Sequence, residues 1–278
     1  MRSPSIYLLM LLQTLHFRSA LALRMPLTGA SHAFTQSSSG FSATWRSQTI
    51  TSRPSSRALN MASLLPEFKG QVQTVNGKLV SVNLVRELEL TDVNGELKTV
   101  GSLMGRGKSV VVFLRHLGCP FCWAYVDLWN SFVPRMRKSG VAGPVFISIG
   151  DKDKLRLFLD QNPDADPAQF LVDDYALGAY ESVGFGKILS DRGATRRGAL
   201  RIRRPKFGFK KWRDYLRSVA RLLPIPMGSL RKRIFPSGVT QLGGTIGMNR
   251  NDVVYMYADG VPGDHPSPSD VLDNLERA

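Results

Sequence analysis

Short apolar runs alternate with amphipathic stretches from about residue 79 to the end of the chain. The clearest run is Val110 to Leu114, whose length and β-branched content predict a strand buried on both faces and ending near Arg115. Apolar residues then recur at a helical spacing, which predicts one buried helix face made of Cys122, Val126, Trp129, Val133 and Met136. Because Pro134 lies inside this helix, we expect it to kink the helix or end it early.

The rest of this region predicts two β-hairpins and further alternating elements. Asn94-Gly95 lies between two extended segments, 79–90 and 96–100, and is typical of a hairpin turn. We also expect strands at 144–150 and 170–172, a helix capped by Asp151, helices at 175–183 and 269–276, and a second hairpin from 246–248 and 253–257. This order predicts an α/β fold with a central mixed sheet flanked by helices.

Two cysteines, the only ones in the chain, lie where the central strand gives way to the helix. Pro120 suits the first helical position, so Cys119 is placed at the helix N-terminus. Free backbone N–H groups and the positive end of the helix dipole stabilise a thiolate there. Cys122 follows one turn later and can attack a disulfide or sulfenic acid on Cys119. The pattern favours a nucleophilic and a resolving thiol; the alternative is a pair of buried structural thiols.

Metal and cofactor chemistry have little support in the sequence. A structural zinc site needs four ligands, and the chain has no second CxxC or HxxxH motif. We therefore expect no bound cofactor and no metal, and turnover of the pair would depend on an external thiol reductant such as thioredoxin.

The first 61 residues have the composition of a targeting sequence. Residues 1 to 66 contain six arginines, no lysine, no acidic residue and many serines and threonines. An apolar run, Ile6 to Leu12, resembles the core of a signal peptide, and Phe34 follows possible cleavage sites as in the two-part presequences of algal plastids. We predict a plastid (chloroplast) location, with mitochondrial import and then secretion as alternatives, and a folded domain at 62–278.

The positive charge is concentrated in one internal segment. Of the net charge of +15, residues 196–233 carry +13 and the leader +6, so the remainder carries −4. Trp212, Tyr215, Leu216, Val219, Leu222 and Leu223 share one face of a basic amphipathic helix in this insertion. Its apolar face is expected to pack on the domain; the alternative is docking on an anionic membrane or an acidic partner. No recognised nucleic-acid-binding motif accompanies the charge.

Two further motifs follow the insertion. Gly243-Gly244-Thr245 precedes a strand, and paired glycines allow close backbone approach to another group, which we expect to be the cysteine pair. His265, in Gly263-Asp264-His265-Pro266, is a possible redox base, with a structural role as the alternative.

Three separated motifs resemble the peroxiredoxin-like 2 family of thioredoxin-fold proteins with an AhpC/TSA-type antioxidant domain. They are Phe113 to Cys122, Gln241 to Thr245 and Gly263 to Pro266, in that order. The family includes a plant chloroplast branch and the prostamide/prostaglandin F synthase of animals. The resemblance covers about residue 79 to the C-terminus and implies a thioredoxin-like sheet with Cys119 and Cys122 as a redox pair.

The chain also departs from related patterns. Val112 and His116 stand where true peroxiredoxins have Pro and Thr before their cysteine, and Gly243-Gly244-Thr245 stands where thioredoxins have a proline. These departures bear on peroxide cleavage and on the recognition of disulfide substrates.

Together these observations predict a thiol-disulfide oxidoreductase or antioxidant protein acting on a peroxide, a disulfide or a lipid endoperoxide. Arg115 and His116 are candidates for lowering the pKa of Cys119, and Pro120, Gly243, Gly244 and Thr245 for support of the site. The alternative is a non-catalytic redox sensor or a membrane-surface adaptor that acts through the basic insertion.

Overall fold

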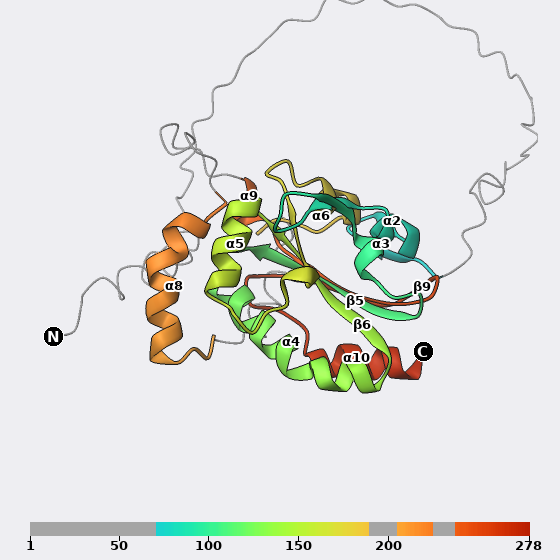
Figure 1. The fold of residues 1–278 in the computed structure, drawn as a ribbon. Helices are drawn as coiled ribbons and strands as arrows, with labels where there is room; N and C mark the ends of the chain where they lie inside the picture. The colour runs from blue at the N-terminus through green and yellow to red at the C-terminus, as the bar shows by residue number, and fades with distance from the viewer. Residues whose placement is uncertain (1–70, 189–204, 225–236) are drawn as a thin grey trace, which may run out of the picture. The chain divides into compact units, whose positions relative to one another are not determined.

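A computed structural model describes residues 71–188, 205–224 and 237–278 (Figure 1). The predicted targeting sequence at 1–61 and parts of the basic insertion lie outside these residues. Within them, a seven-stranded mixed sheet runs in the order β4 (Leu97–Thr99), β3 (Glu89–Thr91), β7 (Phe170–Asp173), β6 (Val141–Ile149), β5 (Lys108–His116), β8 (Gly244–Asn249) and β9 (Asp252–Ala258).

The sheet has the topology of a thioredoxin-like fold. The strands β5, β6 and β7 are parallel to one another, whereas β8 is antiparallel to β5 and β9 to β8. The helix α4 (Pro120–Lys138) connects β5 to β6, and α10 (Pro268–Arg277) follows β9. This parallel β-α-β unit, extended by a hairpin and a last helix, confirms the predicted fold class.

Strand β5 is buried along almost its whole length because each face of the sheet is covered by helices. Val110, Val112 and Leu114 pack into one core with residues of α4, of α5 (Lys152–Asp160), of α8 (Phe209–Leu222) and of α10. Val111 and Phe113 pack into the opposite core with residues of α2 (Val82–Arg86), α3 (Val100–Leu103) and α6 (Gly178–Val183). Figure 1 shows the two groups of helices on opposite sides of the sheet.

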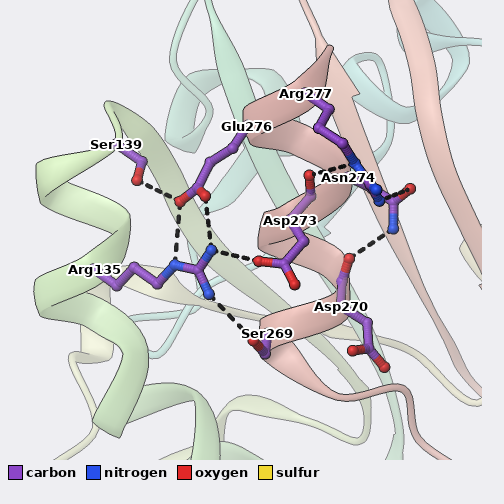
Figure 2. Close-up of polar contacts among 8 residues, drawn as sticks. All are labelled: Arg135, Ser139, Ser269, Asp270, Asp273, Asn274, Glu276 and Arg277. Carbon is purple, nitrogen blue, oxygen red and sulfur yellow. Dashed lines mark hydrogen bonds and ion pairs between the residues drawn. The ribbon is translucent and has the colours of Figure 1, made fainter.

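Helix α4 continues past Pro134 and ends at Lys138, so the predicted early end is wrong. Its last two turns are joined to α10 by a polar cluster around Arg135 (Figure 2). The Arg135 guanidinium donates to both carboxylate oxygens of Glu276, at 3.1 and 2.7 Å, and to Asp273 at 2.5 Å. Ser139, the C-cap of α4, donates to Glu276 at 2.6 Å. These bonds hold the C-terminal end of α4 in place.

Most predicted elements are present, with changes at their ends. The hairpin at Asn94-Gly95 pairs β3 with β4, but the preceding segment is not one strand, because Ser81 accepts a hydrogen bond from Leu84 N and caps α2. Asp151 caps α5 as predicted. Helix α6 begins three residues later than predicted, since Leu177 adopts a left-handed conformation.

One hairpin was not predicted. The strands β1 (Gln73–Val75) and β2 (Lys78–Val80) form a separate two-stranded sheet. Asn76 and Gly77 both have positive φ, 47° and 81°, as a tight hairpin turn requires. The Asn-Gly pair that predicted the hairpin at 94–95 is therefore equally informative at 76–77.

The described part of the insertion is an amphipathic helix, α8, whose apolar face packs on the domain. Tyr215 and Leu222 are buried in the same core as α4 and α5, and Trp212, Leu216 and Val219 pack against that core. Lys210, Arg213, Arg217 and Arg221 are exposed. A short helix, α9 (Ser237–Thr240), then leads into β8. In the described ranges, no helix combines the length and apolar character needed to cross a membrane.

Candidate redox site

Cys119 and Cys122 lie at the end of β5, in the loop and first turn of α4. Cys119 is the N-cap residue of α4, in an extended conformation, and Pro120 occupies the first helical position, as predicted. The backbone N–H of Cys119 donates to the carbonyl of His116 at 3.0 Å, and the Trp123 indole donates to the carbonyl of Leu117 at 2.6 Å. Both thiols are free and buried, with 1% and 0% of each residue exposed.

The Arg115 guanidinium is held beside the Cys119 sulfur. Its Nη1 donates to Cys119 Sγ at 3.5 Å, Nε to the carbonyl of Gln241 at 3.2 Å and Nη2 to the carbonyl of Val239 at 2.6 Å. The backbone N–H of Arg115 also donates to Cys122 Sγ at 3.3 Å. Because two carbonyl groups orient this buried side chain, its positive charge is directed at the sulfur of Cys119.

The pKa values of the two thiols are shifted in opposite directions. Burial acts to raise the pKa of Cys119, but a hydrogen bond from Cys122 and the charges of Arg115 and His265 lower the pKa well below its ordinary value. Burial raises the pKa of Cys122 well above its ordinary value, and the neighbouring Cys119 thiolate raises it further. The start of α4 adds the favourable end of its dipole. The arrangement therefore suits a thiolate at Cys119 and a thiol at Cys122.

His116 lies next to Arg115, but it contacts the cysteine loop through its backbone carbonyl and not through its imidazole. Burial and the charge of Arg115 lower the pKa of the His116 imidazole well below its ordinary value, so this ring is neutral near pH 7. Its Nδ1 is buried and has no hydrogen-bond partner among the described residues. The contact of His116 with the cysteine loop is the carbonyl bond to Cys119 N.

The triplet Gly243-Gly244-Thr245 packs against strand β5. Gly244 pairs with Phe113 and Thr245 with Val112. A Cβ at Gly243 would lie only 1.9 Å from the Phe113 carbonyl oxygen, so the absence of a side chain permits this approach. The Thr245 hydroxyl is 3.2 Å from the hydroxyl of Tyr125 on α4. The triplet thus contacts residues that precede and follow the cysteines.

Helix α8 covers the loop that carries the cysteines. The Tyr215 hydroxyl donates to the carbonyl of Gly118 at 3.1 Å, and a Cβ at Gly118 would lie 3.1 Å from the backbone of Leu222. The Tyr215 ring also packs edge-on against Trp123. The sequence predicts an apolar face on this helix, but nothing in the local pattern shows that the face lies on the loop that carries the cysteines.

A second titratable pair lies close to the cysteines. His265 Nδ1 is 2.9 Å from Asp259 Oδ2, and the two side chains are 8% and 0% exposed. The sequence marked His265 as a possible base but did not identify Asp259, whose carboxylate is brought to it by the turn after β9. Within the described ranges, no group of three or more His, Cys, Asp and Glu side chains is arranged to hold a metal ion.

Comparisons with known proteins give only distant structural similarity. No protein-family profile matches the chain, and no curated protein matches it. The structure is similar to the peroxidoxin BcpB of Mycobacterium tuberculosis, with a TM-score of 0.43 at 14% identity over 75% of this chain and 97% of that chain. A thioredoxin-like protein of Aeropyrum pernix gives a TM-score of 0.33 at 12% identity over 68% and 89% of the two chains.

A third solved structure is a secreted M. tuberculosis disulfide oxidoreductase homologous to E. coli DsbE. Its TM-score is 0.27 at 16% identity, over 36% of this chain and 69% of that chain. The assignment of a thioredoxin-like fold to this chain rests on the strand order and connections described above.

Proposed function

We propose that the protein is a thiol-disulfide oxidoreductase in which Cys119 is the nucleophile and Cys122 the resolving thiol. The observation that carries the proposal is the contrast between the two thiols within one helical turn. At the start of α4, the Cys119 sulfur accepts a hydrogen bond from the Arg115 guanidinium, and its pKa is lowered. Cys122 is buried one turn later, and its pKa is raised. A low-pKa thiolate can attack the substrate, and a second thiol one helical turn away can then resolve the product.

The proposed chemistry has two steps. The Cys119 thiolate attacks one sulfur of a disulfide substrate, forming a mixed disulfide and releasing a thiolate, or it attacks the O–O bond of a hydroperoxide, forming a sulfenic acid and releasing an alkoxide. Attack on an endoperoxide forms a sulfenate ester in place of the sulfenic acid. Cys122 then attacks Cys119 Sγ, forms the intramolecular disulfide and releases the second thiol, water or, from the sulfenate ester, an alcohol. Two electrons pass from the pair to the substrate, and an external dithiol such as thioredoxin restores both thiols.

A trapping experiment tests this assignment. In a Cys122→Ser variant, the mixed disulfide or sulfenic acid on Cys119 should accumulate, because the resolving thiol is absent. A Cys119→Ser variant should form neither species and should lose turnover. Serine closely matches cysteine in size, so each variant serves as the steric control for the other. Equal reactivity of the two variants towards peroxides and disulfides would contradict the assignment.

The class of substrate is determined by comparing the candidates directly. Wild-type protein lacking residues 1–61 is offered an alkyl hydroperoxide, a model disulfide and a lipid endoperoxide, with thioredoxin as the reductant. The substrate that oxidises Cys119 with the largest rate constant defines the activity. The family resemblance supports the endoperoxide as a substrate, whereas the composition of residues 1–61 supports the plastid location. Import of the leader fused to a fluorescent protein tests that location.

The basic face of α8 supports a second candidate function, docking on an anionic membrane or an acidic partner. Since most of the apolar face packs on the domain, the exposed side of α8 is mainly the charged one, with Phe209 at its start also exposed. Replacement of Lys210, Arg217 and Arg221 by Gln should then weaken binding to anionic vesicles. Replacement of three exposed basic residues on other elements, Arg137, Lys138 and Arg250, is the matched control. Equal binding of both triple variants would end this idea.

A further inference from the structure

The pair formed by His265 and Asp259 lies against the first two turns of α4, the helix that begins at Cys119. A Cβ at Gly263 would lie 2.6 Å from the ring of Phe121, and the His265 ring stacks on Tyr125 with centroids 4.4 Å apart and planes at 14°. Phe121 and Tyr125 are one turn apart on α4 and flank Cys122 in the sequence. The loop from Asp259 to His265 therefore follows the first turns of α4, next to the redox pair.

Only one of the two ring nitrogens of His265 has a polar partner among the described residues. Its Nδ1 faces Asp259 Oδ2 at 2.9 Å, and Asp259 is itself anchored, since its backbone N–H donates to the carbonyl of Gly243 at 3.0 Å. The other ring nitrogen, Nε2, is buried and has no hydrogen-bond partner among the described residues. A buried ring nitrogen without a partner costs stability, which calls for an explanation.

The charges around Cys119 balance when His265 carries a proton. A Cys119 thiolate and the Asp259 carboxylate are then matched by the Arg115 guanidinium and the His265 imidazolium. The other titratable groups around this cluster are Cys122, whose pKa is raised by burial and by Cys119, and four tyrosines, whose pKa values are raised by burial: Tyr125, Tyr180, Tyr215 and Tyr255. Asp264 lies in the same loop and accepts hydrogen bonds from Tyr257 and Gly260 N.

From this geometry we propose that His265 is the proton donor to the group that leaves when Cys119 attacks, and that Asp259 positions and charges it. The inference rests on the proposed function. As the Cys119 S–S or S–O bond forms, the His265 Nε2 proton passes to the departing thiolate or alkoxide. Cys122 then displaces the second group, its own proton leaves with that thiol or water, and His265 recovers a proton from solvent.

The pKa shifts of His265 and Asp259 agree with the role of His265 as a proton donor. Burial acts to lower the pKa of His265, but the Asp259 carboxylate and the Cys119 thiolate outweigh it and raise the pKa above its ordinary value. Burial raises the pKa of Asp259, an effect opposed by His265. The imidazolium is therefore stabilised as long as Cys119 is a thiolate, and it becomes a stronger acid when Cys119 has reacted.

The test compares two reactions of Cys119 that differ in their need for a proton. Alkylation by iodoacetamide releases iodide, which takes up no proton, whereas reduction of an alkyl disulfide releases a basic thiolate. In His265→Gln, alkylation above the Cys119 pKa should match wild type, and disulfide reduction should slow by at least about tenfold. Asp259→Asn should slow disulfide reduction in the same way, because the imidazole loses its partner.

Asp264→Asn is the control for damage to the loop, and its ratio of the two rates should equal that of wild type. If His265→Gln slows both reactions equally, or neither, the proposal is overturned. If wild-type Cys119 reacts with no disulfide or peroxide, the proposed function fails instead, which is a different result.

A measurement on intact protein covers the case in which the variants unfold. The His265 imidazole is titrated by NMR in the wild-type chain and in Cys119→Ser. Because interacting sites shift each other's titration, the apparent pKa of His265 should fall when the thiolate is removed. An unchanged His265 titration would also overturn the proposal.

Discussion

The Tyr215 hydroxyl donates a hydrogen bond of 3.1 Å to the carbonyl oxygen of Gly118, and this bond joins α8 to the residue immediately before Cys119. Leu222, two turns further along the same helix, contacts Gly118 from its backbone. Cys119 is 1% exposed, and we therefore expect α8, whose sequence lies far from the cysteines, to limit access to it. Local opening of α8 is the step that we expect to admit substrates.

The first prediction is that Tyr215→Phe increases the reactivity of Cys119. The change removes one hydrogen bond, worth about 0.5–1.5 kcal/mol, and so favours opening of α8 by roughly two- to tenfold. The measurement is the rate of alkylation by a bulky maleimide at a pH above the Cys119 pKa. Tyr255→Phe on β9 is the matched control, and an unchanged rate in Tyr215→Phe would contradict control of access by α8.

The second prediction concerns Arg115. Arg115→Met should raise the pKa of Cys119, because the positive charge next to its sulfur is lost. The carbonyl groups of Gln241 and Val239 also lose their donor, which should lower the free energy of unfolding by about 1–3 kcal/mol. Thiolate absorbance as a function of pH and chemical denaturation measure the two effects. A thiol pKa equal to that of wild type would show that Arg115 does not set the acidity.

The third prediction is that Gly243→Ala is strongly destabilising. Its Cβ would lie 1.9 Å from the Phe113 carbonyl oxygen, so β8 must move away from β5, at a cost of about 2 kcal/mol or more. Gly178→Ala is the control, since nothing lies within 4 Å of a Cβ there and the change falls in α6. Thermal unfolding of the two variants provides the comparison, and similar melting temperatures would refute the close approach.

The fourth prediction concerns the ion pairs that join α4 to α10. Hydrogen bonds from Arg135 and Ser139 lower the pKa of Glu276 to about 2, below its ordinary value of 4.5. Because the pKa of Glu276 is lower in the folded than in the unfolded chain, its ion pairs stabilise the fold above about pH 4.5. This stabilisation is lost as the pH falls towards 2. In Glu276→Gln, the free energy of unfolding should therefore decrease less than in wild type as the pH falls from about 4.5 to 2. Identical acid unfolding curves for wild type and variant would contradict it.

The central elements of the fold were predictable because their causes are local. The β-branched run before Cys119 forms β5, Pro120 begins α4, and Asp151 caps α5, as their residue types require. The end of α4 was not predictable in the same way. Arg135 and Ser139 bind Glu276 of α10, and these long-range bonds hold the last turn together beyond Pro134.

The candidate site was predictable only in part, for a related reason. The cysteines, Pro120 and Arg115 are close in sequence, so their spacing predicts their proximity. The acceptors of Arg115 at Val239 and Gln241, the Tyr215 contact and the Asp259–His265 pair come from segments that the tertiary fold brings together. The paired glycines did predict a close backbone approach, but the structure places it at Phe113.

The most direct test of the account is the redox titration of the Cys119–Cys122 pair in protein lacking residues 1–61, with the pKa of Cys119 measured on the reduced form. We expect a reversible intramolecular disulfide with a potential of roughly −200 to −300 mV. We also expect a thiol that stays ionised as the pH falls below about 8 and reacts more slowly only below its lowered pKa. If the two thiols never form a disulfide and Cys119 titrates as an inert buried thiol, the proposed function is wrong.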